Sequence, residues 1–123
     1  MLINSGLKKF IEANAMGFAT VSKAGKPHNI AVACVKVIDD QVIISSAHIK
    51  ESTKNLTYNN NAALVIWNPE WENSCVGFEL VGTAKNYTSG KWLEYVRSLP
   101  DNKGYNITSA IVIKVKKIKR LLS

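Results

Sequence analysis

A strand that runs straight into a helix, at residues 42–56, constrains the fold of this chain most. The first half of the segment is rich in Val and Ile, as in a strand, and the second half, from Lys50 on, has the composition of a helix start. The first N–H groups of a helix lack partners within it and lie at the positive end of its dipole. Ser52 and Thr53 add hydroxyl donors there, and Lys50 and Lys54 add positive charge. This pattern predicts a phosphate-binding site, although an ordinary N-cap with two solvated lysines explains the same residues.

The hydrophobic pattern of the remaining sequence predicts a mainly β fold. Short turns rich in Gly, Pro, Asn and Asp separate runs of β-branched residues, which favours an antiparallel sheet that is closed or nearly closed, its first three strands forming a meander. Gly17 is expected to end a first helix, and Thr88 to cap a third. Strands are expected at 18–22, 28–37, 42–46, 62–67, 76–87 and 107–118, and helices at 2–14, 51–60 and after Thr88.

Length and composition are those of one globular domain, 1–123, of 123 residues. No segment is apolar and long enough to cross a bilayer, and the N-terminus has no signal-peptide pattern, so we expect a cytoplasmic protein. Its two cysteines, Cys34 and Cys75, are then expected to be reduced. The net charge of +7 favours anionic ligands. The lysines near the C-terminus are typical of the solvent-exposed face of an edge strand.

The usual catalytic arrangements are missing from the sequence. It has two histidines, His28 and His48, and no metal-ligand spacing, nucleophile elbow, P-loop or Gly-x-Gly-x-x-Gly motif. We therefore predict no catalytic residue and no metal site. Any redox chemistry has to come from a cofactor, so whether the protein is an enzyme stays open.

Several short motifs occur in an order that resembles a known family. They are Ala19-Thr20-Val21, Gly25-x-Pro27-His28, the helix start at 50–56, the strand start at 61–65 and the segment 77–84. In order and spacing the chain resembles the FMN-binding split barrel of the pyridoxamine 5'-phosphate oxidase-like superfamily, most of all the small bacterial FMN-binding proteins. The resemblance implies a six-stranded antiparallel split β-barrel with about three short helices. It also implies FMN as cofactor and a homodimer with the flavin at its interface.

The same resemblance assigns the flavin-binding residues. It implies a phosphate site at the helix start and a flavin ring that lies along the second and third strands and approaches the start of the fifth. The residues are Lys50, Ser52 and Thr53 for the phosphate, Ala31, Val32 and Ala33 beside the ring, Ser45 and Ser46 across from them, and Gly77.

Two positions depart from the family pattern. Many relatives have Lys or Arg at the positions of Glu51 and Ser52, so Lys50 or Lys54 would have to supply the charge here. Some small relatives have an aromatic residue near Asn106 that covers the ring. Tyr105 and Trp92 are the possible substitutes in this chain.

We favour an FMN-binding oxidoreductase or electron carrier that exchanges electrons or hydride with a small-molecule donor or acceptor. A non-catalytic protein that binds flavin or another phosphate-bearing ligand is the alternative, and the deazaflavin F420 is a weaker option. Nucleic acid is disfavoured because the basic tail lacks aromatic platforms. Trp71 is expected at the subunit interface or beside the flavin, with a surface position on a neighbouring loop as the alternative, whereas Trp67 is expected in the core.

Overall fold

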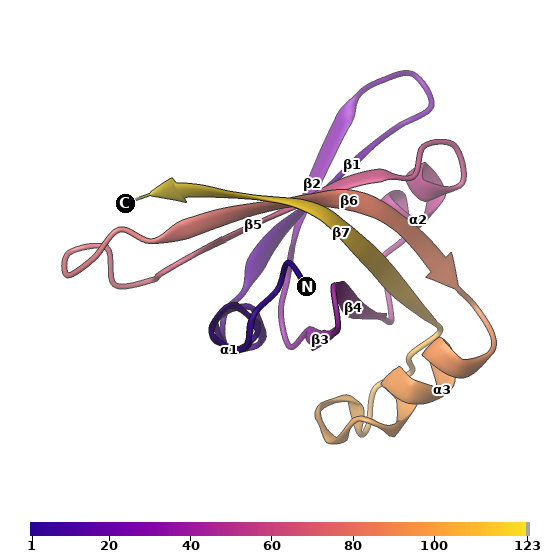
Figure 1. Ribbon diagram of the computed structural model, residues 1–123. Helices are drawn as coiled ribbons and strands as arrows, with labels where there is room; N and C mark the ends of the chain where they lie inside the picture. The colour runs from indigo at the N-terminus through magenta and orange to yellow at the C-terminus, as the bar shows by residue number, and fades with distance from the viewer. Residues whose placement is uncertain (123) are drawn as a thin grey trace.

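The computed structural model describes residues 1–122, and in this range one antiparallel sheet of seven strands is flanked by three α-helices (Figure 1). A mainly β fold is therefore confirmed. The strand order is β2-β1-β5-β6-β7-β4-β3. The elements in chain order are α1 (Ser5–Ala13), β1 (Met16–Val21), β2 (Pro27–Val32), β3 (Lys36–Ile38), β4 (Gln41–Ser46), α2 (Glu51–Leu56), β5 (Asn61–Trp67), β6 (Gly77–Tyr87), α3 (Lys91–Ser98), the 3-10 turn η1 (Pro100–Asn102) and β7 (Ser109–Leu122).

The connection between β2 and β3 shows that the sheet curls into a split barrel. These two strands are the opposite edges of the sheet, yet three residues, 33–35, join them. Four Cα–Cα steps span at most about 14 Å, whereas six strand spacings in a flat sheet would separate the edges by about 29 Å. The edges must therefore come together, and the predicted split barrel is confirmed.

The number and order of the first strands differ from the prediction. The run 28–37 was expected to be one strand, but Cys34 adopts a left-handed conformation, with φ of 57°, that interrupts it. The run becomes β2 and β3, so the barrel has seven strands in place of six. Both neighbour pairs of the predicted meander occur, β1 with β2 and β3 with β4, but the break at Cys34 places the two pairs at opposite edges of the sheet.

The helices are shorter than expected because side chains and glycines end them locally. Asn4 caps α1, its Oδ1 accepting a hydrogen bond from the Leu7 N–H at 2.8 Å. At the other end, the Asn14 amide donates to the Phe10 carbonyl, so α1 ends before Gly17, which lies in β1. The third helix begins after Gly90, with φ of 89°, and Thr88 does not cap it.

The hydrophobic core has two parts. The larger fills the barrel between α1 and the inner faces of the strands and includes Ile11, Phe18 and Leu80. The smaller packs α3 against β4 and β7. Within residues 1–122, no helix has the length and apolar character needed to cross a bilayer.

A bulge in β7 lets the longest strands bend around this core. The register between β6 and β7 shifts next to Gly82. A Cβ atom at Gly82 would lie 1.9 Å from the Lys114 carbonyl oxygen, so the close approach of the two backbones requires glycine.

Candidate functional site

The start of α2, where the sequence places a phosphate, carries two hydroxyls in different environments. The Thr53 hydroxyl lies within hydrogen-bond distance of two carbonyl oxygens, Ile49 at 2.8 Å and Lys50 at 2.9 Å. The hydroxyl hydrogen is therefore already used in hydrogen bonding to the backbone. Lys50 occupies the N-cap position without a side-chain capping bond, and the Lys50 and Glu51 side chains are exposed.

Ser52 is the unusual residue of this helix. Its side chain is fully buried, at 0% exposure. Among the residues that the structure describes, its Oγ and the Asn86 Oδ1 are the two buried side-chain polar atoms without a hydrogen-bond partner. Leaving such a hydroxyl unpaired costs about 1–3 kcal/mol, and a bound water or ligand commonly supplies the partner.

A buried hydrogen bond fixes α2 on the barrel. The Asn55 amide nitrogen donates to Thr20 Oγ1 at 3.0 Å, and both residues are at least 95% buried. The helix packs against β1 and also contacts β2 and β6. Ser52 and Thr53 are thus held near β2, the strand that carries Ala31. Periodicity did not predict this bond, because a polar residue on a short helix gives no signal of burial.

Small side chains cover the outer face of the sheet beside β2. Ala31 is exposed and pairs with Gly17, which pairs in turn with Val65. A Cβ atom at Gly17 would lie 3.0 Å from Val65 Cγ1. The side chains on this face therefore pack closely and project only a short distance from the sheet. Ala33 is exposed as well, whereas the Val32 side chain is buried, and only its backbone can approach a ligand outside the barrel.

Ser45 and Ser46 lie at the end of β4, and the four residues 47–50 separate this end from α2. Ser45 Oγ accepts a hydrogen bond from the Asn102 amide at 2.8 Å. The buried Ser46 accepts at its carbonyl from the Thr108 N–H at 2.9 Å. These bonds hold the end of β4 against η1 and the segment that leads into β7.

Gly77 lies apart from the other predicted residues. It pairs with Trp67, four residues along β5 from Ala63, which pairs with Ala19 next to the anchor of α2. Four residues of a strand span about 13 Å. Thr20 also faces the barrel interior, whereas Trp67 faces outward. Figure 1 shows the β5–β6 loop and α2 at opposite ends of the barrel.

Two tryptophans gather beside Gly77. Trp67 and Trp71, with Val65, Gly77 and Leu121, line an apolar hollow of about 350 Å³. The prediction that Trp67 packs in the core is wrong: its neighbour Ile66 is fully buried, so the alternation of the strand turns Trp67 outward, at 42% exposure. Trp71 is half exposed, as expected from its flanking glutamates.

The aromatic residues near Asn106 have different environments. Asn106 is exposed, and so is Tyr105. Trp92 packs edge-on against Tyr95, with 6.3 Å between the ring centroids, within the α3 part of the core. Of the two possible substitutes for a ring-covering aromatic, Tyr105 is the exposed one.

Sequence comparison identifies the family of this chain. The family described as pyridoxamine 5'-phosphate oxidase matches residues 4–121. The chain belongs to this family. The uncharacterized protein MJ0282 of Methanocaldococcus jannaschii is 29% identical over 123 residues, which cover 94% of this chain and 78% of the relative.

Solved structures of the same fold include proteins that are named for different ligands. HupZ of Group A Streptococcus superposes with a TM-score of 0.88 at 20% identity, covering 99% of this chain and 96% of that one. An FMN-binding protein from Syntrophomonas wolfei has a TM-score of 0.77 at 15% identity, with 94% and 84% covered. HutZ, a heme storage protein of Vibrio cholerae, has a TM-score of 0.70 at 14% identity, with 99% and 95% covered. At these identities the similarity establishes the fold alone.

Proposed function

We propose that this protein binds FMN and acts as a small oxidoreductase or electron carrier, with the flavin at the interface of a homodimer. The observation that carries the proposal is the buried, unpaired hydroxyl of Ser52 at the start of α2, in a chain of this family. The Syntrophomonas wolfei protein, which shares the fold, is named for FMN binding.

The residues around α2 suit a flavin phosphate. Ser52 supplies a hydroxyl, and the first turn supplies backbone N–H groups. Lys50 and Lys54 supply positive charge, which the negative charge of the nearby Glu51 partly offsets. Thr53 contributes a donor only if its hydroxyl turns away from the two carbonyls that it now contacts.

The flavin ring would lie near the ends of β2 and β4. The exposed Ala31 and Ala33, with the backbone of Val32, leave space for a flat ring, and Ser45 and Ser46 lie at the end of β4. When bound, FMN supplies the hydride or electron chemistry. The protein's part is to hold and orient the flavin and to exclude water.

A second copy of the chain would complete the site. Gly77 lies about 13 Å along β5 from the position beside the anchor of α2, at the other end of the barrel and on its outer face, so we assign the ring contact of Gly77 to the partner subunit. Exposed apolar side chains on the same outer face, Val81, Trp67, Trp71 and Leu121, support burial of this face.

Ligand titration of the purified protein tests the proposal. FMN, F420 and hemin are added separately, and binding is followed by flavin absorbance, F420 absorbance and the Soret band. Saturable binding of FMN, followed by its reduction with NADH or NADPH, supports a redox role, and FMN binding without turnover supports the non-catalytic alternative. Binding of hemin in place of FMN would instead assign the function named for HutZ.

A further inference from the structure

The side chain of Asn102 in η1 makes two hydrogen bonds with one nitrogen atom. Its Nδ2 donates to the Val96 carbonyl oxygen of α3 at 2.7 Å and to Ser45 Oγ of β4 at 2.8 Å. The atom beside the carbonyl oxygen must be the amide nitrogen, because the amide oxygen has no proton to donate. Both N–H groups of the amide are therefore used, and the orientation of the side chain is determined.

The bond from Asn102 also determines the role of the Ser45 hydroxyl. A serine hydroxyl has one proton to donate and two lone pairs that can accept. Because an amide N–H only donates, Ser45 Oγ accepts from Asn102 and keeps its own proton for another acceptor. Within residues 1–122, the Ser45 hydroxyl donates to no other group. It is a donor without an acceptor in the protein.

Ser45 lies just beyond the end of the ladder between β3 and β4. The last pair of this ladder is Lys36 with Ile43. The same register would place Cys34 opposite Ser45, but the left-handed backbone of Cys34 turns the chain out of the ladder. Ala33 precedes Lys36 by three residues, and the half-buried Ser45 follows Ile43 by two. Two residues assigned to the flavin ring thus diverge from the end of one strand pair.

The donor to Ser45 is itself held in place from two strands. Asp101, its neighbour in η1, forms an ion pair with Lys36 of β3, with 3.5 Å between Oδ2 and Nζ. Leu93 and Val96 of α3 pack in one cluster with Ile43 of β4. The Asn102 amide is therefore fixed over the end of β4 before any ligand binds.

We propose that Asn102 is a positioning residue that makes the Ser45 hydroxyl a hydrogen-bond donor to the ring of the bound flavin. The inference rests on the flavin site proposed above and on its assignment of Ser45 to the ring. A donor to a ring oxygen or nitrogen stabilises the electron-rich reduced ring more than the oxidised ring, because the acceptor gains negative charge. Asn102 therefore raises the reduction potential of FMN, and it does so through Ser45.

The two-electron reduction potential of FMN in the full-length protein tests this coupling. It is measured against a reference dye in wild type, Ser45→Ala, Asn102→Ala and the double variant. Ser45→Ala should lower the ratio of reduced to oxidised FMN at a fixed potential at least about tenfold, which corresponds to about 30 mV. Asn102→Ala, which frees the hydroxyl to rotate, should act in the same direction and by less. It should have no further effect in the Ser45→Ala background.

The side-chain amide signals of Asn102 test the hydrogen bonds in the flavin-free protein. Both amide protons are bonded in wild type. In isotope-labelled Ser45→Ala, the proton that faces Ser45 should shift, whereas the proton bonded to Val96 should not. Ser45→Thr keeps the hydroxyl, so it should retain both the amide signals and the potential of wild type.

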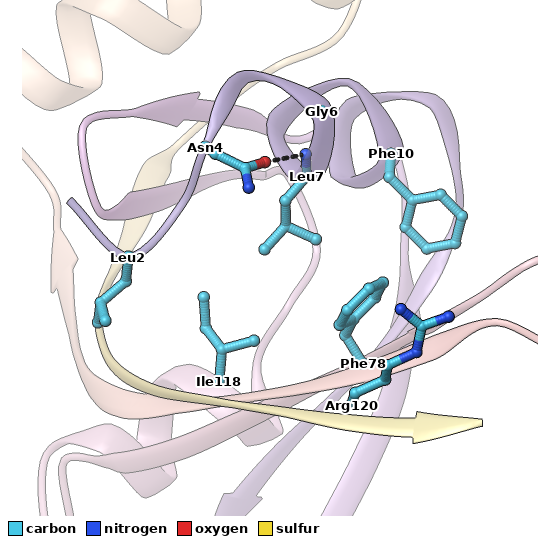
Figure 2. A pocket seen from close by; sticks show the side chains of 8 residues that line it. All are labelled: Leu2, Asn4, Gly6, Leu7, Phe10, Phe78, Ile118 and Arg120. Atoms are coloured by element: carbon cyan, nitrogen blue, oxygen red, sulfur yellow. Dashed lines mark hydrogen bonds between the residues drawn. The ribbon is translucent and has the colours of Figure 1, made fainter. Parts of the chain in front are cut away.

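Asn4 provides a matched control. Its Oδ1 accepts a hydrogen bond from the Leu7 N–H at 2.8 Å, and Figure 2 shows it beside the hollow between α1 and the strands β6 and β7. No residue that lines this hollow within the described part of the chain belongs to the proposed flavin site. Asn4→Ala should destabilise α1 by loss of its N-cap and leave the FMN potential unchanged.

Three results would overturn the inference. They are an unchanged potential in Ser45→Ala, an equal effect of Asn102→Ala with and without the Ser45 hydroxyl, and Asn102 amide signals that do not respond to Ser45→Ala. Any of these in a protein that binds FMN overturns this inference alone. Failure of the wild-type protein to bind FMN overturns the proposed function and this inference together.

Discussion

Replacing Ser52 by alanine should change stability and FMN affinity in opposite directions. In the free protein the Ser52 hydroxyl is fully buried and unpaired, so its removal relieves a desolvation cost of about 1–3 kcal/mol. The lost oxygen leaves only a small void. We therefore expect the free energy of unfolding to stay constant or to rise by about 1 kcal/mol. If the hydroxyl donates to the flavin phosphate, the variant loses about 1.5–3 kcal/mol of binding, which is roughly tenfold or more in Kd.

Thr53 provides a contrast within the same turn. Its hydroxyl already bonds to backbone carbonyls, so Thr53→Ala should lose about 1 kcal/mol of stability. Its effect on FMN should be smaller than that of Ser52→Ala, and the double variant should bind FMN at least about tenfold more weakly than wild type. Thr57→Ala is a control, because that hydroxyl donates to the Lys54 carbonyl at the far end of α2.

Urea denaturation of the flavin-free protein and fluorescence titration with FMN give the two quantities. Unchanged FMN affinity in the double variant would show that the phosphate binds elsewhere. A loss of more than about 1 kcal/mol of stability in Ser52→Ala would show that the hydroxyl is paired in the free protein and would contradict the prediction.

Three further predictions concern other parts of the molecule. Flavin addition should quench tryptophan fluorescence, and Trp71→Phe should remove much of the quenching; identical quenching in the variant would exclude Trp71 as a neighbour of the ring. Light scattering at micromolar concentration should show a dimer, and a monomer alone would contradict the shared site. Backbone N–H donation from Ile3 and Leu2 lowers the pKa of the Asp40 carboxyl. Its stabilising contribution is therefore complete above the unfolded-state pKa and is lost as pH falls through the lower folded-state value; Asp40→Asn should flatten this part of the pH–stability curve in acid denaturation, and an unchanged curve would contradict it.

The sequence predicted the strand-to-helix junction and most strands, because alternation and turn residues are local signals. It could not predict the break at Cys34. That residue lies in a continuous apolar run, and nothing in its type indicates a left-handed conformation. The missing seventh strand follows from this one residue.

Strand neighbours were harder to predict than strands, because pairing depends on contacts distant in sequence. Consecutive strands commonly pair, and both predicted neighbour pairs occur, β1 with β2 and β3 with β4. Here β2 and β3 are consecutive and nevertheless form opposite edges, because the sheet closes on itself. In a barrel, one short kinked connection can join the two edge strands of the sheet. A pattern of local propensities does not show such a connection.

The residues proposed for the phosphate could be grouped from the sequence because they are adjacent in it. Composition alone brought Lys50, Ser52 and Thr53 together, but it could not show which hydroxyl is occupied and which is unpaired. That difference depends on burial and on the local carbonyls. The prediction that Trp67 lies in the core was wrong for the same reason, since its apolar character is equally compatible with either face of β5.

The separation of Gly77 from α2 links flavin binding to assembly. If, as proposed, the contacts of one flavin to α2 and to Gly77 come from different subunits, each bound FMN stabilises the dimer by the free energy of its contacts to the second chain. By mass action, FMN should then favour the dimer, and dilution below the dimer's dissociation constant should weaken FMN binding. A flavin held within one chain would show an affinity independent of protein concentration. The concentration dependence of FMN affinity therefore distinguishes a shared site from one that α2 and its neighbouring strands form alone.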